Sequence, residues 1–330
     1  MTAATGNPST GVSAAPLAID EPSSQRAALA WGAVIAAFFA ALPLVLSTYQ
    51  VSVATEVIIF ALLAMSIDVL AGYAGRTSLG HGAIFGASTY VVVYWTAVMG
   101  GSPWVALAIG VLAATALSAV FALFCTRVSG VYFLLLTLAL GMIVWGVCLR
   151  WTSVTGGENG IRGVGRPDPI ADPLVFYYTV LVVVMALTWV IWRFVRSPFG
   201  LTLRGVRDSE SRMRSLGYNV QLHMFLAFTV SGFFAGVAGA LYALFNNFVS
   251  PSTVQLSQSV EGLLMAIIGG VGTLAGSFIG AAAIITLENV VSQYTARWPT
   301  VLGLMFVLAM IFAPEGVIGA VRRLIARKKT

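Results

Sequence analysis

Apolar segments about as long as a membrane-crossing helix follow one another through most of this chain of 330 residues. A helix needs about 20 apolar residues to cross the hydrocarbon core of a bilayer. Ten segments come close to that length, at 28–46, 52–71, 78–99, 103–125, 131–151, 174–193, 222–246, 257–272, 274–292 and 298–314. Only 9% of the residues are charged, against about 25% in a soluble domain, so the chain could not cover a water-facing surface. We therefore predict an all-α, polytopic transmembrane bundle of about 8–10 spans, some of them interrupted by glycine. The segments 257–272 and 274–292 are short, so they could be broken or re-entrant rather than full crossings.

Three regions follow from this pattern. Residues 1–25 are small and polar, and the first basic residue of the chain is Arg26. A secretory signal begins with a basic region and soon reaches an apolar core, so we expect a disordered cytoplasmic tail here instead. The transmembrane domain takes residues 26–318 and contains a cytoplasmic loop at 196–221, and a basic cytoplasmic tail takes 319–330.

Basic residues set the expected orientation, because Lys and Arg gather on the cytoplasmic side of a membrane. Six arginines lie in or beside the loop after the sixth span, and five Lys and Arg lie in the C-terminal tail. Four predicted spans separate the two clusters, so both can be cytoplasmic, and counting back also places Arg26, Arg76 and Arg127 inside. The loop 152–173 then lies outside, and both termini are cytoplasmic. The net charge of +6 is concentrated in these clusters, which excludes nucleic-acid binding as a main role.

Two glycine-rich segments in opposite halves of the chain are the main indication of a pathway through the membrane. One runs from Gly72 to Gly86 and the other from Gly269 to Gly280. Glycine-interrupted segments in both halves indicate a transport pathway, although close helix packing through small residues explains the same pattern equally well. The pathway candidates are Gly75, Ser78, His81, Glu261, Gly269 and Gly272.

Ionisable residues inside the predicted spans are few, and one charge at mid-membrane is unfavourable by roughly 2.5–3.5 kcal/mol. The acids are Glu56, Asp68, Glu261 and Glu288. Three of them lie nearer the outer ends of their spans, which argues against a proton or sodium relay. They are either polar residues facing the bundle interior or a polar patch that meets a zwitterionic solute, and His81 is either a structural residue or part of the pathway lining. No catalytic set or metal spacing can be assembled, including around Cys125 and Cys148, so we do not expect an enzyme.

The most informative loop runs from 197 to 220. A turn signal at Ser197-Pro198 opens it, and the residues that follow predict one short amphipathic helix that ends at Gly217. Its apolar positions are Leu201, Val206, Met213 and Leu216, and its charged positions are Arg204, Arg207, Asp208, Glu210, Arg212 and Arg214. Such a helix could bind anionic lipid or dock a soluble partner, and its mixture of acids and bases favours the partner.

Nucleotide hydrolysis by this chain is excluded on local grounds. A P-loop needs a lysine in the pattern GxxxxGK[ST], and the only lysines are Lys328 and Lys329 in the tail. Any ATP-driven work therefore requires a separate subunit.

Five ordered motifs resemble those of LivM-type permeases, the membrane subunits of branched-chain amino acid ABC importers. Residues 70–83 (LAGYAGRTSLGHGA) resemble the family's GxxGxxSLGH segment, and residues 130–139 resemble its GxYFxxxTLA helix. Residues 155–161 are similar to its outer TGGxxG loop, and residues 207–218 are similar to its RDNE…ALGY coupling segment. Residues 262–276 are similar to its last glycine-rich region.

The resemblance runs from about residue 52 to 318 and implies a fold like that of type II ABC importers. It implies a heterodimer with a second, related permease, two ABC ATPase subunits and an extracytoplasmic solute-binding protein, in a bacterial cytoplasmic (inner) membrane. The ATPase would bind ATP and Mg²⁺, with no cofactor in this chain. The residues that would seat in the ATPase are Gly200, Arg204, Arg207, Asp208, Glu210, Arg212, Ser215, Leu216 and Gly217. The residues that would meet the binding protein are Gly156, Gly157, Glu158 and Asn159.

One departure from the family pattern concerns the docking surface. The family commonly has two alanines and an acid after RDNE, whereas this chain has Arg212, Met213 and Arg214. The surface is therefore more basic, and we expect either an acidic partner at this place or a different docking angle.

We expect alternating access, in which ATP binding closes the ATPase dimer, drags the 200–217 helix and opens the glycine-rich pathway to one side. The resemblance implies branched-chain or other small amino acids as cargo. Two other functions stay open. One is an ion-coupled secondary transporter with Asp68, Glu261 or Glu288 as coupling site, and the other is a permease or channel for urea or another small solute.

Overall fold

The computed structural model describes residues 22–163 and 165–294, with positions 300, 301, 303, 304, 307, 316 and 319. Its longer helices are α1 (Pro22–Ala41), α2 (Thr48–Asp68), α3 (His81–Ala97), α4 (Pro103–Cys125), α5 (Val131–Arg150), α7 (Pro173–Val195), α8 (Pro198–Asp208), α10 (Val220–Asn246), α11 (Leu256–Gly269) and α12 (Leu274–Val291). The short elements are η1 (Leu42–Leu44), the π-helix η2 (Val69–Ala74), α6 (Thr152–Thr155), η3 (Gly157–Asn159), β1 (Ile161–Arg162), η4 (Asp168–Ile170), α9 (Glu210–Ser215), β2 (Phe248–Val249) and η5 (Pro251–Val254).

Helices occupy nine of the ten predicted spans, which confirms the all-α bundle. Proline in the first turn begins α4, α7 and α8, where its missing N–H leaves no hydrogen bond unmade. Within the described residues, six stretches are long and apolar enough to cross a membrane. The predicted tenth span, 298–314, and the predicted tails lie largely outside the described residues, except that α1 already begins at Pro22.

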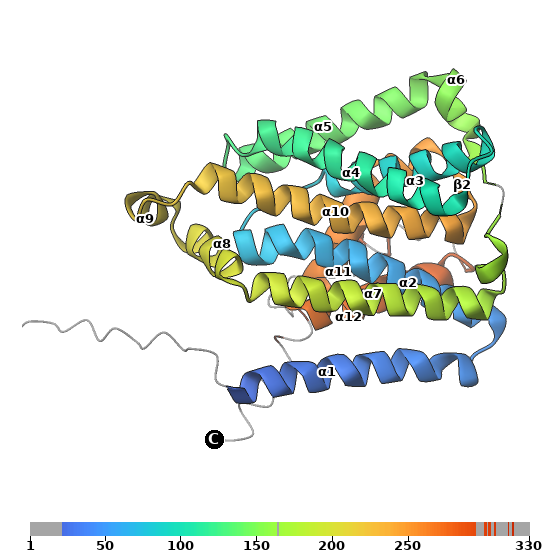
Figure 1. Cartoon of the computed structure of the whole chain (residues 1–330), viewed down its shortest axis with the longest axis horizontal. Helices are drawn as coiled ribbons and strands as arrows, with labels where there is room; N and C mark the ends of the chain where they lie inside the picture. Colours follow the sequence, from blue (N-terminus) through green and yellow to red (C-terminus); the bar gives the residue numbers. More distant parts are fainter. Residues whose placement is uncertain are drawn as a thin grey trace, which may run out of the picture.

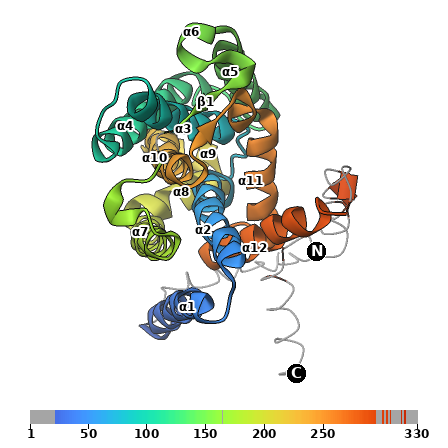
Figure 2. The same ribbon diagram turned by 90° about the vertical axis from the view of Figure 1, so that its right-hand side faces the viewer.

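The centre of the bundle is α2. The most apolar part of Thr48–Ala74 is 94% buried inside the protein, and Figure 2 shows α2 surrounded by α7, α10, α11 and α12. A helix that is apolar on every face is typical of a core position. Its two buried hydroxyl groups are satisfied within the helix, because Thr55 donates to Val51 O (2.8 Å) and Ser66 donates to Leu63 O (2.6 Å).

The predicted span at 257–272 is not a full crossing. Its helix, α11, has 14 residues and rises about 21 Å, whereas the hydrocarbon core is about 30 Å thick. In Figure 2, where α2, α7 and α10 are seen nearly end-on, α11 runs across the view. It packs directly on α12, because a Cβ on Gly276 would lie 2.5 Å from the carbonyl oxygen of Gly269. The glycines of the second segment thus allow two helix backbones to touch.

The two ends of the bundle carry different elements. Figure 1 shows α8 and α9 at one end and α6 with β2 at the other. β1 and β2 pair antiparallel, with Ile161 opposite Val249 and Arg162 opposite Phe248. The loops 152–173 and 196–221 therefore lie at opposite ends, as the predicted topology requires. Which end faces the cytoplasm stays a prediction.

Candidate functional site

A sharp reversal joins α7 to the loop 196–221. The side chain of Ser197 accepts the N–H of Gly200 (3.3 Å), which caps the first turn of α8. Gly200 lies against the last turn of α7, and a Cβ there would meet the backbone of Val195. Only glycine fits this close approach, which explains why glycine occupies position 200. The role of Gly200 in coupling stays a prediction.

The prediction of a single helix in this loop is wrong, because the structure has two. Ser209 is extended (φ −165°, ψ 103°), and its side chain accepts the N–H of Arg212 as the N-cap of α9. The predicted end is confirmed: Gly217 is left-handed (φ +86°), and Tyr218 N donates back to Met213 O (3.1 Å) in the Schellman pattern. An Asp-Ser pair followed by an acid is a capping signal, and here it outweighs the helical pattern.

α8 and α9 bury one face and expose another. Leu203, Val206 and Met213 are buried against the bundle, whereas the side chains of Leu201 and Leu216 are 59% and 66% exposed. Two of the four apolar positions predicted to meet a partner therefore face inward. The polar side chains on the exposed surface are Arg207, Asp208, Ser211, Arg212, Arg214 and Ser215. Exposed leucines among charged groups are typical of a surface that docks another protein.

Two of the arginines predicted to meet the ATPase also contact the first glycine-rich segment. Arg207 Nη1 donates to Gly72 O (2.6 Å), and the Arg204 guanidinium lies 5.2 Å from the centre of the Tyr73 ring. Gly75 is left-handed (φ +70°), and its backbone lies against the Arg207 side chain. The Arg207 side chain keeps 46% of its exposure, so its contact with a partner stays a prediction beside this internal one.

Arg76 is a functional candidate that the sequence analysis missed. Its guanidinium forms an ion pair with Glu210 of α9 and donates to Val128 O in the loop between α4 and α5. It also lies 5.4 Å from the centre of the Phe133 ring. Its side chain is only 6% exposed. A lone arginine in an apolar, glycine-rich stretch is the signal that could have identified it.

The two glycine-rich segments touch each other. A Cβ on Gly72 would lie 2.5 Å from Gly272 N. Asp68 Oδ1 accepts the N–H of Gly272 (2.7 Å), and the Tyr73 hydroxyl donates to Gly272 O (3.1 Å). This contact supports the interpretation of the glycines as packing residues, while the pathway role of Gly75, Gly269 and Gly272 stays a prediction.

His81 is held inside the bundle. It is fully buried, with Nδ1 at 3.1 Å from Ser78 Oγ and Nε2 at 2.7 Å from Ser231 Oγ. Two residues before it, Leu79 donates its N–H to Thr137 Oγ1 (3.0 Å). Thr137 is the seventh residue of α5, so Leu79, just before α3, lies beside a point about 9 Å along α5 from the start of that helix. Side-chain hydroxyls satisfy the irregular backbone there, as the membrane interior requires. A pathway role for Ser78 and His81 stays a prediction.

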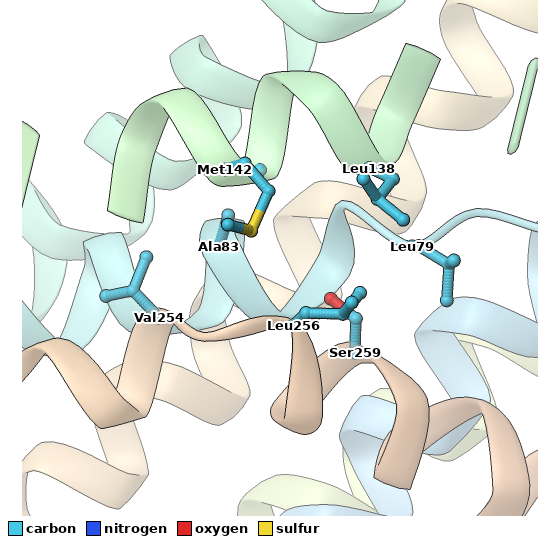
Figure 3. Close-up of a pocket in the computed structure, with 8 residues that line it drawn as sticks. Leu79, Ala83, Leu138, Met142, Val254, Leu256 and Ser259 are labelled. Carbon is cyan, nitrogen blue, oxygen red and sulfur yellow. The ribbon is translucent and has the colours of Figure 1, made fainter. Parts of the chain in front are cut away.

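A small crevice lies where α3 and α5 meet the η5–α11 segment (Figure 3). It is too narrow to hold a water molecule in this structure, and its lining is Leu79, Ala83, Leu138, Gly141, Met142, Val254, Leu256 and Ser259. Ser259 Oγ, which supplies its polar group, accepts the N–H of Gly82 (2.8 Å). Glu261 is buried nearby on α11, and Gln258 Nε2 donates to it (3.2 Å). The crevice is thus apolar with one hydroxyl, and it adjoins the first glycine-rich segment.

The loop at the opposite end exposes two of the four residues predicted to meet a binding protein. Gly156, Gly157 and Gly160 are all left-handed, with φ of +73°, +58° and +67°, and they form a tight turn before β1. Glu158 and Asn159 are exposed at its tip, whereas Gly157 is buried. Docking at this turn stays a prediction.

Arg166 secures this end of the bundle, and its removal is expected to destabilise the protein. Its Nε donates to Leu244 O (3.1 Å) and its guanidinium lies 4.2 Å from the centre of the Phe176 ring. Burial lowers the pKa of Arg166, but an arginine remains charged at neutral pH and favours a helix C-terminus. We expect Arg166→Leu to reduce the free energy of unfolding by about 1.5–3 kcal/mol, measured by thermal unfolding in detergent. Arg162→Leu, at an exposed site in the same loop, is the control, and an equal loss in both variants would contradict this role.

Comparison with known families decides what kind of protein carries these features. The family described as "Branched-chain amino acid transport system / permease component" matches residues 49–313, from the start of α2 onward. The chain belongs to this permease family. The permease is a multi-pass membrane protein and a transport component rather than an enzyme. The match includes both glycine-rich segments, the crevice and the pair α8–α9.

The permease is similar to several characterised transport proteins. It is 28% identical over 308 residues to the "High-affinity branched-chain amino acid transport system permease protein LivM" of Escherichia coli, covering 85% of this chain and 72% of LivM. It is 23% identical over 283 residues to LivH of the same organism, covering 79% of this chain and 91% of LivH. It is also 30% identical over 154 residues to the "Autoinducer 2 import system permease protein LsrC" of Klebsiella pneumoniae, covering 44% of this chain and 43% of LsrC. No solved structure matches. The resemblance to LivM-type permeases is thus confirmed.

Proposed function

We propose that this permease is the membrane subunit of an ATP-driven importer for branched-chain or other small amino acids, working by alternating access. The observation that carries the proposal is the similarity to LivM over 85% of the chain. Similarity to LivH as well supports a heterodimer in which a second, related permease completes the membrane part. The complex would lie in a bacterial inner membrane with both termini of this chain in the cytoplasm.

Two ABC ATPase subunits would supply the energy and bind ATP and Mg²⁺, with no cofactor in this chain. The exposed leucines of α8–α9 support a protein partner at this end, since they lie among charged side chains rather than in a purely basic patch. The exposed tip at Glu158 and Asn159 supports a second partner, an extracytoplasmic solute-binding protein, at the opposite end.

The lining of the crevice favours a solute with an aliphatic side chain. Leu138, Met142 and Leu256 offer side chains that suit an apolar group, and Ser259 offers one hydroxyl. No charged side chain lines it, so recognition of the amino and carboxylate groups falls to the binding protein. We place the solute path along this crevice, which would widen when α3, α5 and α11 move apart.

Reconstitution of the whole complex tests the proposal. Proteoliposomes holding both permeases and the ATPase, supplied with binding protein outside and ATP inside, are expected to accumulate radiolabelled leucine and not urea. Proton and sodium ionophores are expected to leave the uptake unchanged. Accumulation by this chain alone under an ion gradient, or urea flux without nucleotide, would instead support one of the other two functions.

The exposed leucines are expected to carry the docking of the ATPase. Because burial of a leucine contributes about 1.5–3 kcal/mol, changing both Leu201 and Leu216 to serine is expected to weaken ATPase binding by at least about tenfold. Titration of ATPase onto the purified permease pair measures this affinity. Ser211→Ala, at an exposed site on α9 outside the predicted docking set, is the control and should bind normally. Equal affinity of the leucine variant and the wild type would place the docking surface elsewhere.

A further inference from the structure

Two arginines join α8–α9 to the first glycine-rich segment in opposite directions. Arg76, from the glycine-rich segment, reaches out to Glu210 of α9. Arg207, from α8, reaches in to Gly72 O (2.6 Å). We refer to these four residues, Arg76, Glu210, Arg207 and Gly72, as the arginine clasp.

Burial and charge both strengthen the contacts of the clasp. Arg76 is almost fully buried and Glu210 is 30% exposed, so the ion pair is shielded from salt more than a surface pair would be. Both contacts are charge-assisted hydrogen bonds, which are stronger than neutral ones. Arg76 also donates to Val128 O, so the same guanidinium joins α9 to the loop before α5.

Three elements that line the crevice begin or end beside the clasp. α5 follows directly after Val128, the acceptor of Arg76. α3 follows the irregular stretch that begins at Gly75, against which the Arg207 side chain lies. α11 ends at the turn containing Gly272, whose N–H and C=O are held by Asp68 and Tyr73 on either side of Gly72. A displacement of α8–α9 would therefore reach α3, α5 and α11 together.

We propose that the arginine clasp transmits the movement of α8–α9 to the helices that line the crevice, with Arg76 and Arg207 as positioning residues. This inference rests on the proposed function. It differs from a docking role, because Arg76 is buried inside the chain rather than offered to a partner. Without the clasp, the ATPase would still dock and hydrolyse ATP, but the resulting displacement of α8–α9 would not open the crevice.

The test compares transport with hydrolysis in the reconstituted complex. In Arg76→Met, leucine uptake per ATP hydrolysed is expected to fall about tenfold, with ATPase activity within about threefold of wild type. In Arg207→Met the same ratio of uptake to hydrolysis is expected to fall, whatever the ATPase activity, because Arg207 is also predicted to meet the ATPase. The charge exchange Arg76→Glu with Glu210→Arg is expected to recover part of the lost ratio. Arg214→Met is the matched control, since Arg214 pairs with the same Glu210 (3.5 Å) from a side chain that is 62% exposed.

A second readout does not require solute. Spin labels at position 143 on α5 and position 257 on α11, both exposed in the structure, report the distance between two helices that line the crevice. ATP binding is expected to change this distance in the wild type and in Arg214→Met, but not in the clasp variants.

Three results would overturn the inference. The first is an unchanged ratio of uptake to hydrolysis in both clasp variants. The second is a normal ATP-driven distance change in both of them. The third is loss of the assembled complex without recovery by the charge exchange, which would show a merely structural role. Failure of the proposed function would look different, because the wild-type complex itself would then show no ATP-dependent leucine uptake.

Discussion

We expect Gly72→Ala to destabilise the folded permease severely. The new Cβ would lie 2.5 Å from Gly272 N and 2.6 Å from Asp68 Oδ1, far inside the 3.5–4.0 Å or so at which carbon atoms normally pack. Overpacking usually destabilises by about 1–3 kcal/mol, and more when backbone must move. Here the opposing atom belongs to backbone, so we expect about 3 kcal/mol or more, seen as a large fall in both membrane yield and thermal stability.

Gly146→Ala is the matched control for this prediction. Gly146 lies inside α5, and a Cβ there would have no neighbour within 4 Å. Alanine stabilises an unstrained helix by about 1 kcal/mol relative to glycine, so the same substitution is expected to have the opposite sign at the two positions. Equal stability of the two variants would show that η2 and the turn before α12 do not pack as closely as described.

The spans were predictable because each one depends on residues that are close together in the sequence. Apolar runs of the right length, with Pro103 and Pro173 at their starts, mark where helices begin, and each helix satisfies its own backbone. The left-handed Gly217 likewise marked the end of α9. Local rules failed at Ser209, where a capping side chain ended a helix that the hydrophobic pattern would have continued.

The candidate site was only partly predictable, because its decisive contacts join residues far apart in the chain. The sequence around Gly72 is the same whether this glycine lines a pathway or packs against Gly272, 200 residues later, so the pattern does not distinguish the two roles. Arg207 likewise reads the same whether it faces a partner or reaches Gly72. Helical periodicity reports which side of a helix is apolar, and it carries no information on which backbone carbonyl a long side chain will find. The sequence could therefore assign the segments to one end of the bundle, but not the clasp between them.

Substitutions of Asp68 are expected to separate the structural role of this acid from a role in ion coupling. Asp68 is fully buried in α2, and its Oδ1 accepts the N–H of Gly272 (2.7 Å). We expect Asp68→Ala to destabilise the permease by about 1–3 kcal/mol for the unsatisfied N–H, with a further loss for the cavity. Asparagine keeps an acceptor oxygen in place, and its NH₂ replaces Oδ2, which has no hydrogen-bond partner among the described residues. Asp68→Asn is therefore expected to fold with nearly normal thermal stability.

The two mechanisms then predict opposite transport results for Asp68→Asn. An amide cannot bind and release a proton at neutral pH, so a proton-coupled transporter that uses Asp68 would lose accumulation completely. In an ATP-driven importer the energy enters at α8–α9, and Asp68 only holds the turn at Gly272, so uptake should stay within about threefold of wild type. Initial rates of leucine uptake by the reconstituted complex measure the difference, with Glu261→Gln as the parallel test of the second buried acid. A stable Asp68→Asn protein that hydrolyses ATP but accumulates no leucine would assign this carboxylate a part in the transport cycle itself.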